Sequence, residues 1–528
     1  MASEKGDVKG SAALEADETA SISQGRLDTI HNIDERVQHL AREAPPFYRN
    51  HNLLILYMLM VPGCIIPAVT LGFDSAMMNG LQSVPTWLSY FGNPEGSTLG
   101  ILNAVLALGA ICATPFISPV CDRWGRRMGI FVGAIIMLIG GVIQGASVHI
   151  AMFIISRFVI GSGLIFANAC VPVLMGELAH PKDRMVVTSL YQTSWYIGAI
   201  IAAWTTFGTF RIDNNWAWRI PSYMQAGFAV IQIMGVWFLP ESPRFLIAKG
   251  RTNEAKAVLT KYHANGDEES ALVDLAFAEM RATIESEMTA MKGWKTLLQT
   301  PGNRRRMLLM VLLGLFSQWS GNGLVSYYLG KVLATVGVTS SNTQTIINGC
   351  LMIFNWITAT TSAFLTAKLK RRTQFLISGF GMLAVFSAQT LCAGLFNEHG
   401  NQGAGYGVVA MLFVYYAFYN LGFNALVYSY PVEVLPYPIR AKGFSVLMFF
   451  GKVANFLNTF VNPIGLQAMS WKYYAVYVGW LCVECGCIWA FFVETKGPSL
   501  EAIATAFDGE RVAVHVGQLK EVEDKTKE

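Results

Sequence analysis

Two residues of opposite charge lie inside apolar stretches of the sequence. Asp74 belongs to the run TLGFDSAMMNG, and Arg157 belongs to the run ISRFVIGSG. A single charge is expensive in an apolar environment, whereas an ion pair or a protonated carboxyl group is tolerated. A carboxylate that alternately holds an arginine and binds a proton can couple proton movement to another process, and the alternative is a permanent structural ion pair. We expect Asp74 and Arg157 to form a proton-coupling pair.

Uncharged polar side chains form a second set within apolar stretches, and most of them lie in the second half of the chain. Amides exchange hydrogen bonds with hydroxyl groups, and aromatic rings stack on sugar faces. A single Asn or Gln serves equally often as a link between helices, so the set as a whole favours a polyhydroxy ligand. Lys452, in the same region, either extends toward water or reaches the ligand, and the sequence leaves both readings open. The binding candidates are Gln192, Gln318, Asn322, Asn355, Tyr428 and Asn455, with Asn458 nearby, and Tyr327 and Tyr328 are candidates for an extracellular gate.

Acidic and basic residues recur together at the ends of the apolar stretches. Such ion pairs could act as latches that break when helices move apart, and the alternative is that the arginines only fix the orientation in the membrane. Glu177 and Arg184 are seven residues apart, as are Glu433 and Arg440, and this repetition favours latches. The latch candidates are Asp122, Arg123, Arg126, Arg127, Glu177, Arg184, Glu241, Arg244, Glu433 and Arg440.

These residues must be positioned by membrane helices. The sequence is 53% hydrophobic and only 14% charged, whereas soluble globular domains carry about 25% charged residues. A spanning helix needs about 20 mostly apolar residues. Twelve such segments are predicted, near residues 53–80, 98–120, 128–148, 151–175, 186–208, 218–239, 305–331, 343–367, 374–396, 404–431, 442–465 and 472–493.

The loops set the domain organisation and the orientation. Lys and Arg gather in alternate loops, which places those loops, both tails and the long polar insert in the cytoplasm. The insert is rich in Glu, Lys, Arg and Ala, and this pattern is typical of short amphipathic helices. We expect a disordered cytoplasmic tail (1–50), a six-helix half (51–239), the helical insert (240–304), a second six-helix half (305–494) and a cytoplasmic tail (495–528).

The two halves repeat each other's motifs. The run DRWGRR follows the second predicted helix, and AKLKRR follows the eighth. The sixth helix is followed by PESPR and the twelfth by ETKG. Such recurrence indicates an internal duplication, and duplicated halves around a site at the midplane are typical of transporters.

Several other functions are disfavoured. A net charge of +4 gives no reason to expect nucleic acid. Cys482, Cys485 and Cys487 lie in an apolar stretch without a nearby His, so we expect no metal and no cofactor. The eight His lie mainly in tails and loops, so a catalytic set within the helices is not predicted and the protein is not expected to be an enzyme. The expected partners are a small sugar, a proton and membrane lipid, with the chain acting as a monomer.

The motifs resemble, in order, those of the sugar porter family of the major facilitator superfamily. The matching runs are DRWGRR, SRFVIGSG, PVLMGELAHPKDR, WRIP, PESPRFL, QWSGNGLVSYY, PVEVLPYPIRAKG and ETKG. The resemblance implies an all-α membrane protein with twelve transmembrane helices in two halves, a cytoplasmic helical insert, alternating access and a central sugar site. It also implies sugar contacts at Gln192, Gln318, Asn355 and Asn455, and a coupling pair at Asp74 and Arg157.

The sequence departs from the family pattern within the expected site. Ser317 stands where a Gln is frequent, Gly323 where an Asn is frequent, and Tyr428 and Lys452 at positions that carry Trp in other members. Smaller residues leave more room, and the run QWSGNGLVSYYL resembles the fungal lactose and cellodextrin permeases. In the second half, Ala367 and Lys370 replace an Asp and a Gly of the loop motif, and Val493 replaces a Pro. We therefore predict a plasma-membrane, proton-coupled disaccharide carrier, the alternatives being a facilitative hexose or polyol uniporter and a non-transporting sugar sensor.

Overall fold

The computed structural model describes residues 36–37, 39–289, 294–366, 368–435, 437–496 and 507. Within these ranges the regular elements are all helices. Most of the two tails that the sequence analysis expected lies outside them.

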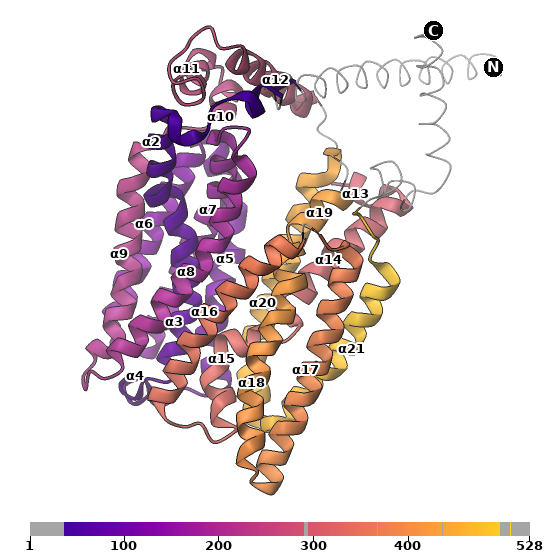
Figure 1. Ribbon diagram of the computed structural model, residues 1–528. Helices are drawn as coiled ribbons and strands as arrows, with labels where there is room; N and C mark the ends of the chain where they lie inside the picture. Colours follow the sequence, from indigo (N-terminus) through magenta and orange to yellow (C-terminus); the bar gives the residue numbers. More distant parts are fainter. Residues whose placement is uncertain are drawn as a thin grey trace, which may run out of the picture.

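The first half of the chain is a bundle of helices in which each of the first six predicted segments is helical. The first segment is interrupted by a π-helical turn at Val61–Ile65, which separates α2 from α3. A short helix, α4 (Pro85–Tyr90), follows α3 at the end of the bundle away from the insert (Figure 1). The long helices are α2 (His51–Met60), α3 (Ile66–Leu81), α5 (Gly96–Trp124), α6 (Arg126–Gly145), α7 (Ile150–Leu178), α8 (Arg184–Thr209) and α9 (Trp216–Phe238).

The second half repeats this plan with two interrupted helices. The seventh predicted segment is split into α14 (Pro301–Trp319) and α15 (Asn322–Ala334), and the tenth into α18 (Gln402–Tyr419) and α19 (Ser429–Val434). The remaining helices are α16 (Ser341–Thr366), α17 (Arg371–His399), α20 (Tyr437–Met469) and α21 (Tyr473–Phe491). Nine helical stretches of the described residues are long and apolar enough to cross a membrane, and one of them, Lys442–Phe491, covers most of α20 and all of α21.

The first three helices of the insert form a layer across one end of the first half, whereas its fourth helix lies beside α14 in the second half (Figure 1). We call the end that this layer covers the insert end of the molecule, and the opposite end, near α4, the far end. A small apolar core that includes Leu246, Leu259 and Met280 holds the first three insert helices together. The insert consists of α10 (Pro243–Ala248), α11 (Thr252–His263), α12 (Ala271–Thr289) and α13 (Thr296–Gln299).

Small residues allow the helices of the first half to approach closely. A Cβ atom at Gly72 of α3 would lie 1.8 Å from the Trp195 carbonyl oxygen of α8, and one at Gly198 would lie 1.9 Å from the Val69 carbonyl oxygen. Close contact through glycine is common between membrane helices, because the hydrophobic effect does not drive their association within lipid. The α3–α8 contact therefore fixes the position of Asp74, which lies in the middle of α3.

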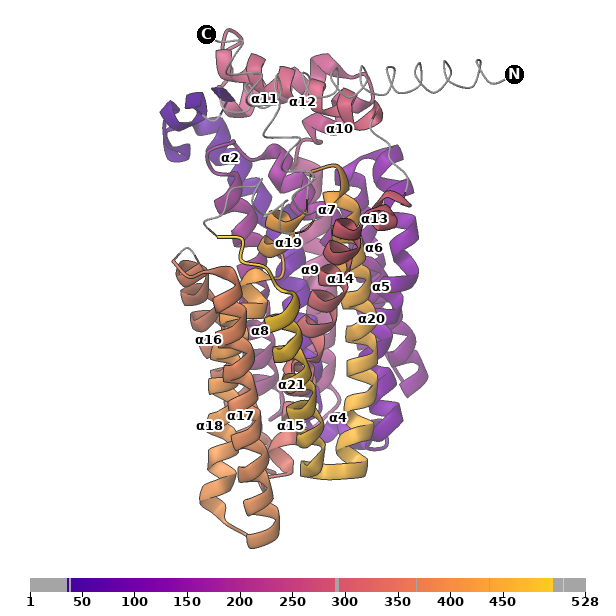
Figure 2. The ribbon, with the colours of Figure 1, turned by 90° about the vertical axis from the view of Figure 1, so that its right-hand side faces the viewer.

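The two halves meet along two pairs of helices. The helix α5 of the first half packs on α20 of the second, and α8 packs on α16. Figure 2, turned by 90°, shows α20 running alongside α5. These contacts bring the middle of α3 next to α15, so residues of both halves share one central region.

Candidate functional site

The predicted coupling pair is formed in the centre of the first half. Arg157 Nη1 lies 3.2 Å from Asp74 Oδ1, and both side chains are almost completely buried. Gln225 of α9 donates a second hydrogen bond of 2.6 Å to the same oxygen, and Arg157 Nε donates to the Leu102 carbonyl at 2.7 Å. Among the described residues, Asp74 Oδ2 accepts no hydrogen bond. The two charges therefore compensate each other, and one carboxylate oxygen of Asp74 has no hydrogen-bond partner among the described residues.

A polar path leads from this pair into the second half. Tyr327 of α15 places its hydroxyl beside Ser75, the residue that follows Asp74, and beside Asn455 of α20. Asn455 in turn donates a 2.9 Å hydrogen bond to Gln318 Oε1. Tyr327, Asn455 and Gln318 are all half-buried. The path thus joins the coupling pair to two of the predicted sugar-binding amides.

The break between α14 and α15 lies at the end of this path. Gly321 has a φ of 104°, a left-handed conformation that glycine adopts without steric penalty. Carbonyl groups released by a break need new partners inside a membrane. Ser317 O accepts from Asn322 Nδ2 (3.3 Å) and from the Tyr419 hydroxyl (2.9 Å), and Gln318 O accepts from Asn458 Nδ2. Interrupted helices of this kind frame substrate sites in transporters.

The other predicted binding residues have different surroundings. Asn355 is buried, and its Oδ1 accepts from Asn420, so its amide already links α16 to the interrupted helix α18–α19. Tyr428 follows the π-helical turn at Asn420–Asn424 and is 42% exposed. The backbone of Gln192 lies in α8, but its side chain lies outside the part of the structure that is described.

The two tyrosines predicted as a gate differ from each other. Tyr328 is completely buried; its hydroxyl accepts from Asn103 Nδ2 at 3.1 Å and donates to the Thr459 carbonyl. It therefore links α15 to α5 and α20. Tyr327, on the polar path, is half-buried and is therefore the more accessible of the two tyrosines.

At the insert end, the first half contains a network around the start of α6. Glu241 accepts hydrogen bonds from the backbone N–H groups of Arg126 (3.1 Å) and Arg127 (3.2 Å). A carboxylate at this place satisfies free N–H groups and interacts favourably with the helix dipole. The Arg126 side chain lies 4.0 Å from Glu177, which also accepts from the Ser242 hydroxyl.

The second half repeats this network around the start of α17. Glu494 accepts from the backbone N–H groups of Arg371 (2.9 Å) and Arg372 (3.1 Å). Arg371 Nη2 lies 3.0 Å from Glu433, which also accepts from the Thr495 hydroxyl. The internal duplication inferred from sequence motifs is therefore present in three dimensions, contact for contact.

These networks change the pairing that the sequence suggested. Glu177 and Glu433 were expected to pair with Arg184 and Arg440, seven residues further on, but their ion pairs in the described residues are to Arg126 and Arg371. The reason lies in the tertiary structure. Arg126 and Arg371 are each the first residue of a neighbouring helix, so their side chains reach the glutamates across a helix–helix contact. Arg440 donates to the Leu435 carbonyl at 3.2 Å.

Three further latch candidates lie outside these networks. Asp122 is exposed and accepts a 2.7 Å hydrogen bond from Ser118 of its own helix. Arg123 is also exposed, and Arg244 is half-buried in α10 without an ion pair to any described residue. Arg371 and Glu494 are not among the latch candidates predicted from the sequence, although the repeated motifs contain both.

At the far end and toward the middle, the two halves are joined by direct contacts. Asn79 of α3 donates to Asn348 and accepts from the Leu329 backbone N–H. Gln82 donates to the Tyr327 carbonyl at 2.7 Å, and Glu95 forms a 2.9 Å ion pair with Lys331. These bonds close the far end of the molecule.

Two buried histidines join the insert to the first half. The rings of His180, which follows α7, and His263 of α11 lie 5.3 Å apart between centroids. His263 Nε2 lies 3.0 Å from the Leu178 carbonyl, and His180 Nδ1 accepts from the Lys182 backbone N–H. Burial lowers the pKa of each imidazole from 6.5 to about 4, so both are neutral in the docked insert at neutral pH.

Acid is expected to weaken the docking of the insert. The pKa of each histidine is about 4 when docked and about 6.5 when released. The released state therefore takes up protons first as the pH falls below 6.5. The docked state loses stability progressively down to pH 4, by at most about 3–4 kcal/mol per imidazole. We expect the melting temperature of the purified protein to fall more steeply over this range than that of the variant His180→Asn/His263→Gln. Equal slopes would show that the two histidines do not control docking.

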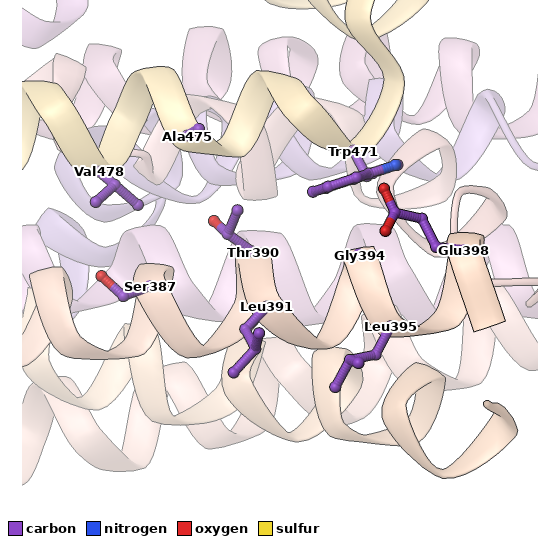
Figure 3. Close-up of a pocket in the computed structure, with 9 residues that line it drawn as sticks. All are labelled: Ser387, Thr390, Leu391, Gly394, Leu395, Glu398, Trp471, Ala475 and Val478. Atoms are coloured by element: carbon purple, nitrogen blue, oxygen red, sulfur yellow. The ribbon is translucent and has the colours of Figure 1, made fainter. Parts of the chain in front are cut away.

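A cavity of about 450 Å³ lies elsewhere, between α17 and α21 near the far end (Figure 3). Its wall is mostly apolar, and Glu398, Thr390 and Trp471 line it. It contains none of the predicted binding residues, so the polar path from Asp74 to the helix break remains the candidate site.

Comparison with known proteins agrees with this arrangement. The family model described as sugar (and other) transporter matches residues 60–507. The chain belongs to this transporter family. It is therefore a multi-pass membrane transporter of the major facilitator superfamily, and its relatives in this family are transporters of sugars and other compounds.

Individual members of the sugar (and other) transporter family are distant in sequence. The MFS-type transporter criB of Aspergillus cristatus is 26% identical over 86% of this chain and 93% of its own. The high-affinity glucose transporter of Kluyveromyces lactis is 26% identical over 89% of each chain. The solved structure of the proton:xylose symporter XylE bound to 6-bromo-6-deoxy-D-glucose has a TM-score of 0.68 and 20% identity, over 87% of this chain and 100% of that one.

Proposed function

We propose that this transporter imports a sugar together with protons, by alternating access, across the plasma membrane. The observation that carries the proposal is the buried Asp74–Arg157 pair, 3.2 Å apart, with Asp74 Oδ2 left without a hydrogen-bond partner among the described residues. A carboxylate in this state can take a proton on the free oxygen and loosen its hold on the arginine. The similarity in fold to a proton:xylose symporter supports the same mechanism.

The polar path explains how sugar and proton binding can depend on each other. A sugar that bonds to Gln318 and Asn455 competes for the 2.9 Å bond between them. Asn455 also contacts Tyr327, whose hydroxyl lies beside Ser75 next to the coupling pair. Occupation of the site therefore changes the surroundings of Asp74, and protonation of Asp74 changes those of the site.

The two glutamate networks are proposed to hold the helix ends together at the insert end, one network within each half, while the halves move. With Lys and Arg concentrated there, that end and both tails are placed in the cytoplasm. The bonds of Asn79, Gln82 and Glu95 at the far end then hold the outer side closed, as in an inward-facing state. Rocking of the halves breaks the far-end bonds, which join the two halves, whereas each glutamate network lies within one half. Tyr327 lies where an outer gate would move.

The sugar is proposed to be a disaccharide of the lactose or cellobiose type. Ser317 is buried and its hydroxyl is used within α14, where it donates to the Gly314 carbonyl at 2.9 Å. Gln318 is therefore the side chain of this pair that lies on the polar path, where a sugar hydroxyl can take over its bonds to Asn455 and Ser317.

The experiment is uptake of labelled lactose, cellobiose, maltose and glucose by cells without sugar carriers of their own. We expect saturable uptake of one of the disaccharides and weak uptake of glucose. Glucose as the preferred substrate would overturn the disaccharide assignment. Signalling without uptake of any sugar would identify a sensor and overturn the transport proposal.

A further inference from the structure

The helix α21 carries a carboxyl group that the coupling mechanism does not use. Glu484 lies in the middle of α21, and its side chain is fully buried. Trp480, one turn earlier on the same face, has its ring 5.1 Å from Trp319 and 6.1 Å from Phe316. The helix therefore presents Trp480 and Glu484 to the end of α14, directly before the break.

The only hydrogen-bond partner of Glu484 in the described residues is the hydroxyl group of Ser320, at the break itself. Ser320 Oγ lies 3.1 Å and 3.0 Å from the two carboxyl oxygens and also contacts the Phe316 carbonyl oxygen. A serine hydroxyl has one proton to donate and can accept two hydrogen bonds. If Ser320 donates to Phe316 O, then the proton between Ser320 and Glu484 must come from Glu484.

The opposite assignment leaves two acceptors facing each other. If Ser320 donated to an ionised Glu484, its oxygen would lie against the Phe316 carbonyl oxygen with no proton between them. An ionised Glu484 would also have no counter-charge, since Ser320 is its only polar contact in the described part of the chain and no Lys, Arg or His there forms an ion pair with it. The titratable groups near it are Tyr415 and Tyr419 of α18 and Cys485 and Cys487 of its own helix, and all of these are uncharged when protonated.

We propose that Glu484 is held as a neutral carboxylic acid and that it donates a hydrogen bond to Ser320 to position the break of the substrate-binding helix. Glu484 is thus a positioning residue for the proposed sugar site. The neighbouring carbonyl groups support this reading, because each already has its own donor: Tyr415 donates to Ser320 O at 3.2 Å and Tyr419 to Ser317 O at 2.9 Å. Glu484 completes the set of donors that keeps Gln318 and Asn322 in place on either side of the break.

The first test compares two substitutions at this position, and it rests on the proposed sugar transport. In Glu484→Gln the amide N–H₂ replaces the acid O–H as donor, so we expect the KM for sugar to stay within about twofold of the parent. In Glu484→Leu the donor is lost, and we expect the KM to rise by about tenfold or more at an equal amount of protein in the membrane. The control is Glu398→Gln, at an exposed glutamate of α17, which should leave both the KM for sugar and the amount of protein in the membrane unchanged. Equal loss of transport in Glu484→Gln and Glu484→Leu would overturn the proposal, because it would mean that the charge is required.

The second test does not depend on transport. Infrared spectra of the purified protein at pH 8 should show the carbonyl stretch of a protonated carboxylic acid. The band should disappear in Glu484→Gln and remain in Asp74→Asn. A spectrum at pH 8 that is unchanged by Glu484→Gln would overturn the proposal even if Glu484→Leu fails to fold. Absence of sugar transport in the parent, with the infrared band assigned to Glu484, would instead overturn the proposed function alone.

Discussion

Replacing Arg157 with Leu is expected to lower the free energy of unfolding by about 3–5 kcal/mol and to abolish sugar accumulation. The guanidinium group is 1% exposed and bonds both Asp74 and the Leu102 carbonyl. Its removal leaves a buried carboxylate with Gln225 as its one remaining partner among the described residues. The measurement is thermal unfolding in detergent together with uptake by intact cells.

The double variant Asp74→Asn/Arg157→Leu tests whether the loss of stability in Arg157→Leu comes from breaking the Asp74–Arg157 ion pair. Without the uncompensated carboxylate, its loss of stability should be smaller than the sum of the two single losses. Arg211→Leu serves as the control, because Arg211 is exposed and rests on the Phe207 ring; it should change stability by about 0.5 kcal/mol or less. Strictly additive losses in the double variant would show that the two charges do not interact.

Replacing Gln318 with Ala is expected to raise the KM for sugar by about 10- to 100-fold, with little change in the amount of folded protein. The amide accepts from Asn455 at 2.9 Å and lies beside the break of α14 and α15. Losing a hydrogen bond to a sugar hydroxyl and leaving polar groups unpaired costs about 1–3 kcal/mol, which corresponds to this range. Concentration-dependent uptake gives the KM directly.

Two other amide substitutions separate binding from packing in that experiment. Gln402→Ala, at the exposed first residue of α18, should leave the KM unchanged. Asn458→Ala should lower stability, because Asn458 bonds both the Gln318 carbonyl and the Tyr477 hydroxyl. A normal KM in Gln318→Ala would move the sugar site away from the helix break.

The membrane helices and the ion pair of Asp74 and Arg157 could be predicted from the sequence, because both follow from the free-energy cost of placing polar groups in lipid. Long apolar segments must be helices if their backbone groups are to be satisfied, so every predicted segment has a helix at its place. Asp74 and Arg157 stood out as isolated charges, and charge compensation brings them together.

The partners in the two insert-end networks could not be predicted from spacing along the chain. Arg126 and Arg371 reach Glu177 and Glu433 from another helix, so a seven-residue interval to Arg184 or Arg440 carries no information about them. The recurrence of DRWGRR and AKLKRR was the available signal, since equivalent positions in two halves make equivalent contacts.

The helix break and Glu484 were missed for a related reason. The segment 305–331 reads as one apolar stretch, and only the run Ser320-Gly321-Asn322 hints at a residue with positive φ. Glu484 lies among Cys482, Cys485 and Cys487, and this segment was considered only as a possible metal site. Gln225 has an ordinary helical context, and its role depends entirely on the packing of α9 against α3.

The most direct test of proton-coupled sugar transport is to record external pH while the preferred sugar is added to cells that express either the parent or Asp74→Asn. We expect the medium to become alkaline with the parent, because protons enter with the sugar. With Asp74→Asn we expect no alkalinisation and no accumulation, since the amide cannot exchange a proton. Equal uptake of labelled sugar in both, without any pH change, would contradict the account and identify a facilitator in which Asp74 is structural.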